Sequence, residues 1–166
     1  MPLSRVPYVL TVESVLSSIR LACRAALHLG LESPRIGVAA FNPHAGEGGL
    51  FGDEELRCIT PAVESAKSEG LPVSGPYPPD VIFRKAYVGE LDMVVAMYHD
   101  QGLIPLKMIA FDKGVNVTVG LPVVRTSPDH GTAFDIAWKG RADCTSMLEA
   151  ILMAGRLSKH KQGDAR

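Results

Sequence analysis

One stretch near the middle of the chain, residues 93–125, constrains the fold more than any other. It begins with the continuous apolar run Met93–Met97, which is too short for a helix and is typical of a strand buried on both faces of a parallel sheet. The run ends in Tyr98-His99-Asp100-Gln101, four side chains that can donate, accept or ligate, and Gly102 closes this stretch. Because open α/β sheets bind ligands at the carboxyl ends of their strands, this junction is the first candidate site.

Segments with helical and strand-like patterns alternate along the chain. Residues 12–29 carry apolar side chains at helical spacing, with Thr11 as a suitable N-cap and Gly30 as a suitable end. We expect further helices over 53–70 (interrupted near Pro61), 80–88, 101–108 and 143–158, and strands over 36–41, 93–97 and 115–119. Residues 71–80 are expected to form an extended connection, and 121–140 mostly loop with one helical turn. This alternation predicts an α/β fold with a mainly parallel sheet.

Two of these helices have apolar faces that we expect to point inward. In the helix over 53–70 the predicted inward residues are Leu56, Ile59, Val63 and Ala66. In the last helix they are Met147, Leu148, Ile151, Leu152 and Gly155.

Composition excludes several classes of protein. The 166 residues are 46% hydrophobic and 21% charged with a net charge of −1, which leaves no basic field for nucleic acid. No segment has the roughly 18 apolar residues of a membrane span. The three cysteines are scattered and form no CxxC pair, which favours a reducing compartment, and we expect a cytoplasmic protein that binds neither nucleic acid nor membrane.

Two histidines each follow a predicted parallel strand directly. His44 lies in the loop after 36–41, and His99 follows Met93–Met97. Imidazoles on neighbouring strand ends can converge on a divalent metal ion, although a lone loop histidine is usually a hydrogen-bonded surface group. Since a catalytic zinc site normally has three protein ligands, His130 is a candidate third, with Asp100 and Glu47 as partners that orient the ligands.

A possible anion site lies around the strand over 115–119. Lys107, Asn116 and Arg125 would form a clamp for carboxylate or phosphate, although each alone is an ordinary surface residue. The glycine-rich loop 46–49 is a poorer phosphate site, because it lacks a P-loop lysine and the acidic residues 53–55 follow it; we interpret it as a tight turn that positions His44. The loop 129–137 has small residues beside His130 and can approach a nucleotide closely, with a structural turn as the alternative.

Several motifs in matching order resemble one known family. NPHAGEGG, AMYHDQGLIPLK, GVNVTVGLP, RTS and DHGTA resemble the C-terminal half of the 4-hydroxythreonine-4-phosphate dehydrogenase (PdxA) family, over nearly the whole chain. The resemblance implies an isocitrate/isopropylmalate dehydrogenase-like fold with flanking helices. It also implies NAD-dependent oxidation of a hydroxy acid followed by decarboxylation, with a divalent metal (Zn, Mg or Co).

The resemblance also implies roles for residues at matching positions. His44 and His99 would be two of three metal ligands, and Lys107, Asn116 and Arg125 would bind substrate. Lys107, as proton donor or base, and Asp100 are the catalytic candidates. His130 has no metal role in the family, so it moves to the nucleotide side with Gly131, Thr132 and Ala133. The expected partners are a phosphorylated hydroxy acid and a second copy of the chain, in a homodimer with a shared active site.

The sequence departs from the family pattern at its start. The family's third metal histidine precedes the position that matches Met1, so we expect a fragment without the N-terminal half. Residues 1–125 would form the metal- and substrate-binding, dimer-forming domain, and 126–166 the return segment of an incomplete nucleotide-binding domain. Trp138 stands where relatives usually carry glycine.

Three classes of substrate remain open within the family. The first candidate is 4-phosphohydroxy-L-threonine, converted to 3-amino-2-oxopropyl phosphate in pyridoxal phosphate synthesis. The alternatives are 4-phospho-D-threonate or 4-phospho-D-erythronate, and the dihydrodiols of aromatic breakdown. A hypothesis of a different class is a non-catalytic remnant that acts only as a dimerising domain.

Overall fold

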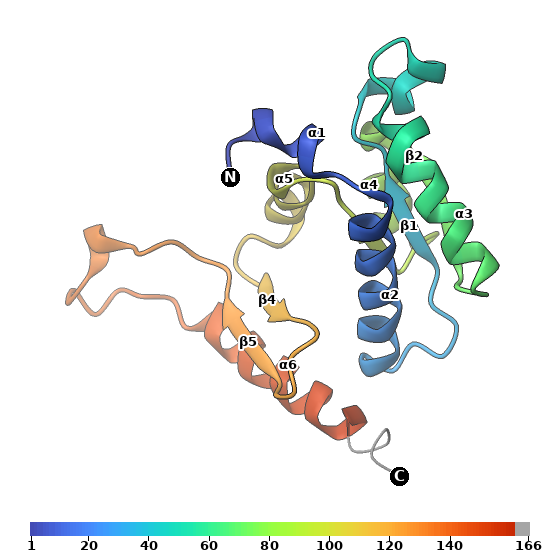
Figure 1. The fold of residues 1–166 in the computed structure, drawn as a ribbon. Coiled ribbons are helices and arrows are strands. Elements are labelled where there is room, and N and C mark those ends of the chain that lie inside the picture. The colour runs from blue at the N-terminus through green and yellow to red at the C-terminus, as the bar shows by residue number, and fades with distance from the viewer. Residues whose placement is uncertain (162–166) are drawn as a thin grey trace. The chain divides into compact units, whose positions relative to one another are not determined.

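The computed structural model describes residues 1–161 and divides into two compact units (Figure 1). Unit 1 is Met1–Pro105, and unit 2 begins at Leu106, so the division falls within helix α5 (His99–Ala110). The predicted domain boundary after residue 125 rests on the family resemblance rather than on compactness, and it stays a prediction. Residues 162–166 of the predicted second domain lie outside the described residues.

Unit 1 is built on a three-stranded parallel sheet. Its strands are β1 (Ile36–Ala39), β2 (Val73–Tyr77) and β3 (Met93–Val95), in the order β2-β1-β3. Ile36 of the central strand lies opposite both Val73 and Met93. The remaining elements of the unit are η1 (Leu3–Arg5), α1 (Val6–Val9), α2 (Val12–His28), η2 (Pro43–Gly49), η3 (Glu55–Ile59), α3 (Thr60–Ser68) and α4 (Pro79–Tyr87). The predicted α/β fold with a parallel sheet is confirmed.

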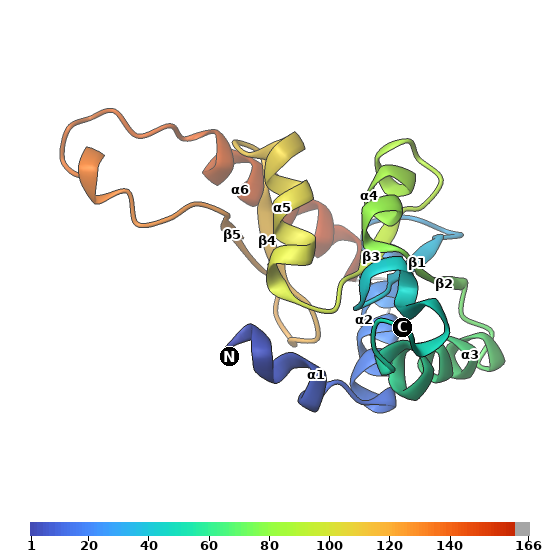
Figure 2. The same ribbon diagram turned by 90° about the horizontal axis from the view of Figure 1, so that it is seen from above.

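Helices cover both faces of this sheet. Ile36 and Val38 belong to the core cluster that includes α2 and α3 residues, whereas Ala39 packs with Ile82 and Leu91 on the other face. Figure 2 shows α4 on the side of the sheet opposite α2 and α3. Strands buried on both faces must be apolar at successive positions, and this explains the continuous apolar runs in the sequence.

Helix α2 begins and ends where its sequence predicts. The Thr11 hydroxyl accepts a hydrogen bond from the Ser14 backbone N–H, and the Ser14 hydroxyl accepts one from the Thr11 N–H. This reciprocal capping satisfies N–H groups that have no partner inside the helix. At the other end Gly30 has φ +87° and its N–H donates to the Leu27 carbonyl, as expected for a terminating glycine.

The expectation that residues 71–80 form only an extended connection is wrong, because Val73–Tyr77 is strand β2. The segment is rich in proline, which argues against a central strand. Strand β2 is an edge strand that pairs only with β1 among the described strands, and its register against β1 shifts between Gly37 and Ala39. An edge strand tolerates proline because one of its sides has no partner strand.

The inward face predicted for the helix over 53–70 is wrong at one position. Leu56 is 58% exposed, and Glu55 is the buried residue, with only 3% of its surface exposed. The cause is the π-helical turn η3, which lies directly before Pro61 and α3, where the sequence predicted an interruption. A π-turn adds one residue to the helix, so side chains before it rotate away from the face that α-helical spacing predicts.

Unit 2 combines a two-stranded antiparallel ribbon with a helix. Its elements are β4 (Val115–Thr118), β5 (Arg125–Pro128), η4 (Phe134–Ile136) and α6 (Thr145–Lys161), besides the end of α5. Strand β5 lies within the segment expected to be mostly loop, and that expectation is wrong over these four residues. The sequence RTSP has no apolar alternation, so only its pairing with β4 makes it a strand.

Helix α6 packs through a face other than the predicted one. Met147, Leu148, Ile151 and Leu152 are 47–61% exposed, while Ala150 is buried. The contact with the ribbon uses small side chains: Ser146 Oγ donates to the Gly114 carbonyl at 3.2 Å, and Thr126 Oγ1 donates to the Ala150 carbonyl at 2.9 Å. Small residues let the helix backbone approach the ribbon, which leaves the larger apolar residues outside.

Within residues 1–161 no single helix has the length and apolarity to cross a membrane. Two consecutive helical segments, Leu3–Val9 and Val12–His28, have the length and composition of a membrane span only when taken together, and the chain bends sharply between them.

Candidate active site at the carboxyl edge of the sheet

The two histidines singled out in the sequence follow neighbouring parallel strands. β1 pairs directly with β3, His44 lies in η2 after β1, and His99 is the first residue of α5 after β3. Because parallel strands all end at one edge of the sheet, both histidines belong to its carboxyl edge. This edge of unit 1 is the candidate site.

The loop that carries His44 has an uncommon backbone. Residues 44–48 all have positive φ, including the non-glycine residues His44 (+53°), Ala45 (+55°) and Glu47 (+43°). L-residues visit this region rarely and usually one at a time, so the surroundings must hold the loop in place. The His44 ring packs on Phe51 with ring centroids 5.7 Å apart. Strain of this kind concentrates at binding and catalytic sites.

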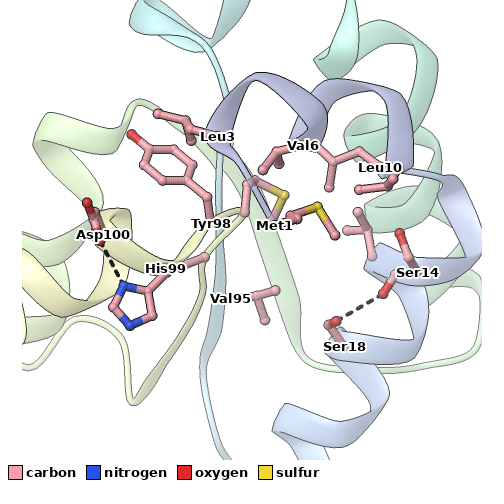
Figure 3. Close-up of a pocket in the computed structure, with 14 residues that line it drawn as sticks. Met1, Leu3, Val6, Leu10, Ser14, Ser18, Val95, Tyr98, His99 and Asp100 are labelled. Atoms are coloured by element: carbon pink, nitrogen blue, oxygen red, sulfur yellow. Dashed lines mark hydrogen bonds and ion pairs between the residues drawn. The ribbon is translucent and has the colours of Figure 1, made fainter.

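His99 is oriented by the residue that follows it. Its Nδ1 lies 2.7 Å from Asp100 Oδ1, and both side chains are more than 70% exposed (Figure 3). With the proton on Nδ1, His99 donates to the carboxylate and its Nε2 retains a lone pair. A carboxylate behind an imidazole in this way is typical of metal-ligating histidines.

A cavity of about 710 Å³ adjoins His99 and Asp100. Apolar side chains of α1, α2 and β3 line most of it, while Tyr98, His99 and Asp100 supply polar groups (Figure 3). Met1 lines the same cavity. Residues at the start of the chain therefore lie beside the strand end that carries His99.

The described residues fit part of a metal site. Two imidazoles at one sheet edge, one of them held by a carboxylate, are suitable donors for a divalent ion. Among residues 1–161 no group of three His, Cys, Asp or Glu side chains could hold a metal by itself. Cys23 and Cys58 do not extend the set, because burial raises the pKa of both thiols.

Two buried polar residues, to which the sequence assigned no role in the site, hold the strand ends. Glu55 accepts hydrogen bonds from the backbone N–H groups of Phe41 and Asn42, and Gln101 bridges the ends of β1 and β3. The acidic run 53–55 was the available signal. A carboxylate there can accept from loop amides as well as repel a phosphate.

The predicted anion-binding residues belong to unit 2. Asn116 and Arg125 lie on the same face of the ribbon, because Asn116 is paired with Ser127 and Thr118 with Arg125. The Arg125 guanidinium donates to Thr118 Oγ1 at 2.9 Å.

Lys107 lies toward the other end of the ribbon. Its Nζ is 3.9 Å from a carboxylate oxygen of Asp129, which follows β5 directly. The strand length between Arg125 and Pro128 is about 10 Å, so the two cations lie toward opposite ends of the ribbon.

The predicted nucleotide-side residues form part of an exposed loop between β5 and α6 (Figure 1). His130, Gly131, Thr132 and Ala133 are all exposed, and the His130 Nδ1 lies 3.0 Å from the Gly131 carbonyl oxygen. Ala133 has φ +49°, and Trp138 is fully exposed with φ +61°. The loop is accessible to a ligand.

Comparisons with known proteins agree on one family. The family model described as pyridoxal phosphate biosynthetic protein PdxA matches residues 1–154. The 4-hydroxythreonine-4-phosphate dehydrogenase of Beijerinckia indica is 59% identical over 86% of this chain and 42% of its own length. The D-threonate 4-phosphate dehydrogenase of Salmonella typhimurium is 60% identical over 78% of this chain and 40% of its own length.

A solved structure shows the same fold. The crystal structure of 4-hydroxythreonine-4-phosphate dehydrogenase from Klebsiella pneumoniae matches with a TM-score of 0.86 and 50% identity, over 95% of this chain and 48% of that one. The chain thus spans somewhat less than half the length of these relatives. With its fold, its motifs and nearly its whole length matched, this chain belongs to the PdxA family of dehydrogenases.

Proposed function

We propose that the protein acts, together with the half that this chain lacks relative to its relatives, as an NAD- and divalent-metal-dependent dehydrogenase. It would oxidise 4-phosphohydroxy-L-threonine and decarboxylate the 3-keto acid to give 3-amino-2-oxopropyl phosphate. The observation that carries this proposal is the pairing of β1 with β3, since each strand is followed by a histidine at the same sheet edge. Membership of the family supports the reaction class.

His44 and His99 would hold the metal ion. When bound, a divalent cation supplies Lewis-acid polarisation of substrate oxygen atoms. Asp100 keeps the His99 ring in one tautomer and orientation through the 2.7 Å contact with Nδ1. The cavity that contains Met1 beside His99 supports a third ligand from residues ahead of position 1, where the family resemblance places a histidine.

The anionic substrate would be held by Asn116 and Arg125 on one ribbon face and by Lys107 near the ribbon's other end. Lys107 would supply the proton that replaces the carboxylate lost as carbon dioxide. NAD, when bound, accepts the hydride from the substrate carbon. His130, Gly131, Thr132 and Ala133 would contact the nucleotide from their exposed loop.

A second substrate is favoured by a specific observation. The relatives named D-threonate 4-phosphate dehydrogenase match this chain at 58–60% identity, close to the 59% of the Beijerinckia protein. We therefore propose 4-phospho-D-threonate as the alternative substrate.

The test is turnover in a fusion that places the N-terminal half of the Klebsiella pneumoniae relative ahead of residue 1. NADH formation at 340 nm is measured with 4-phosphohydroxy-L-threonine, 4-phospho-D-threonate and 4-phospho-D-erythronate. Turnover of the first acid, abolished by His44→Ala or His99→Ala, supports the proposal. A folded, metal-loaded fusion that turns over none of the acids contradicts it and leaves the non-catalytic remnant as the better account.

We also propose that the protein forms a homodimer. The proposal is supported by an exposed apolar face on α6 that a second copy could cover. This face consists of Met147, Leu148, Ile151 and Leu152. Light scattering on the purified chain tests the oligomeric state, and a monodisperse monomer contradicts the proposal.

A further inference from the structure

We propose that Glu55 and Gln101 are positioning residues that hold the His44 loop and the start of α5, which carries His99, at a set separation. The inference rests on the proposed metal site, because the role proposed for Glu55 and Gln101 is to fix the two ligand-bearing segments relative to each other. Neither residue is offered as a ligand, since both are buried and their polar atoms bond to protein groups.

Glu55 holds the backbone that leads into the His44 loop. One of its oxygens, Oε1, accepts from the N–H groups of Phe41 and Asn42, both at 2.8 Å. The other, Oε2, accepts from Asn42 Nδ2 at 2.9 Å. The carboxylate is only 3% exposed, so solvent does not compete for these bonds.

Glu55 also lies against the middle of the same loop. A Cβ atom built on Gly46 would lie 2.6 Å from Glu55 Oε2, so the loop passes the carboxylate at a distance that only glycine permits. Residues 44–48 have positive φ and form no right-handed helical ladder. Within the loop the Phe51 N–H donates to the Gly46 carbonyl at 3.2 Å, and the buried Glu55 carboxylate lies beside Gly46.

Gln101 connects the ends of the two strands. Its Nε2 donates to the Ala40 carbonyl at 2.7 Å, and its Oε1 accepts from the Met97 N–H at 2.7 Å. The last paired residues of the β1–β3 ladder are Val38 and Val95. Beyond that point the Gln101 side chain takes the place of the backbone ladder. It links Ala40 to Met97, which lies two residues before His99.

The two residues together hold one short stretch of backbone. Gln101 binds the carbonyl of Ala40, and Glu55 binds the next two N–H groups, those of Phe41 and Asn42. The backbone just ahead of the His44 loop is therefore hydrogen-bonded by two buried side chains, one of which, Gln101, also binds the end of β3. A metal ion tolerates only small changes in ligand position. Loss of these hydrogen bonds should therefore lower the metal affinity by more than the accompanying loss in the free energy of unfolding accounts for.

The test uses near-isosteric variants and a control on the same strands. Glu55→Gln keeps the side-chain shape but removes one acceptor oxygen, and Gln101→Met keeps the volume but removes both hydrogen bonds. The control, Asp92→Asn, weakens the Arg35–Asp92 pair that joins β1 and β3 at their opposite ends. Cobalt affinity and the cobalt absorption spectrum are measured on the 166-residue chain, beside its urea denaturation midpoint.

Glu55→Gln and Gln101→Met are expected to weaken cobalt binding at least tenfold and to alter the cobalt spectrum, while Asp92→Asn changes the affinity less than twofold. Equal cobalt affinities in all four proteins would overturn the proposal, because a merely structural role lowers stability without moving the ligands.

A second, metal-free readout separates this proposal from the proposed function. Amide hydrogen exchange at residues 41–46 should be at least tenfold faster in Glu55→Gln and Gln101→Met than in Asp92→Asn. If the wild-type chain binds no cobalt, the metal site fails, and the exchange rates still test the positioning role. Unchanged exchange in these residues would reject it.

Discussion

The two edges of the sheet in unit 1 are built by different means. At the amino edge the strands are entered through turns that contain Gly30, Gly70 and Gly89, all with φ between +76° and +87°. A Cβ on Gly70 or Gly89 would meet no atom of the described residues within 4 Å. At the carboxyl edge a Cβ on Gly46 or Gly52 would lie within 2.6 Å of Glu55 or Asn42.

The side chains that hold the strand ends in place differ in the same way. At the amino edge Arg35 and Asp92 form a paired contact with side chains 54% and 22% exposed. At the carboxyl edge Glu55 and Gln101 are buried and bond to backbone groups. An exposed ion pair contributes little, whereas a buried acceptor is costly to remove. The edge that carries the candidate ligands is therefore the one least able to accept substitution.

The largest effect is expected for Glu55→Ala. It leaves two backbone N–H groups without their acceptor and removes one of the two acceptors of the Asn42 side-chain amide, and we expect a loss of about 3 kcal/mol in the free energy of unfolding. Glu54→Ala is the matched control, because Glu54 accepts only from Asn42 Nδ2 among the described contacts. Urea denaturation measures both, and equal losses would remove the distinction between buried and peripheral acceptors.

The glycines provide the next contrast. Gly52 has φ +133°, and its Cβ would lie 2.5 Å from Asn42 Nδ2, so Gly52→Ala combines strain with overlap. Gly70→Ala, at φ +76° in open space, involves strain alone. We expect Gly52→Ala to lower the unfolding free energy by about 2 kcal/mol more than Gly70→Ala. Similar thermal midpoints for the two variants would contradict this.

A smaller effect is expected for Thr11→Ala. This change removes the reciprocal cap with Ser14 at the start of α2, which typically costs about 1 kcal/mol. The cap depends on residues three apart, so its loss should leave amide exchange in the His44 loop unchanged. Faster exchange at residues 41–46 in this variant would show that the carboxyl edge responds to any loss of stability.

The smallest effect concerns pH at the amino edge. The Arg35 guanidinium, together with its backbone N–H, lowers the pKa of Asp92 from its ordinary value of 3.8 to about 2. The pair therefore stabilises the fold above pH 4, and this contribution is lost as the pH falls toward 2. Urea midpoints of wild type and Asp92→Asn should differ at pH 6 and approach each other at pH 2.5.

High salt should reduce the difference in urea midpoint between wild type and Asp92→Asn at pH 6, because the Arg35–Asp92 pair is exposed enough for screening. A difference between the two proteins that is the same at both pH values and both salt concentrations would mean that Asp92 acts through packing rather than charge.

Local sequence rules predicted much of the fold and the positions of two candidate ligands. The cap at Thr11, the end at Gly30 and the strand that begins at Met93 all follow from residues close together in the chain. The placement of His44 and His99 after strands also follows, since it needs only the strand pattern. The roles of Lys107, Asn116, Arg125 and the 130–133 loop stay predictions from the family resemblance.

Where the prediction failed, the deciding partner was distant in the chain. Strand β2 exists because β1 lies beside it, despite its prolines, and β5 exists because β4 pairs with it. On α6, small residues at the ribbon displaced the larger apolar face that periodicity indicated.

The sequence by itself determined the fold class, the family and the residue types available to the site, because these depend on composition, local pattern and motif order. Only the tertiary structure showed that Glu55, rather than Leu56, points inward, and that Gln101 joins the strand ends. The physical reason is that a buried polar group has to find a partner wherever the fold provides one, and no short-range pattern records a partner that is 13 or 61 residues away.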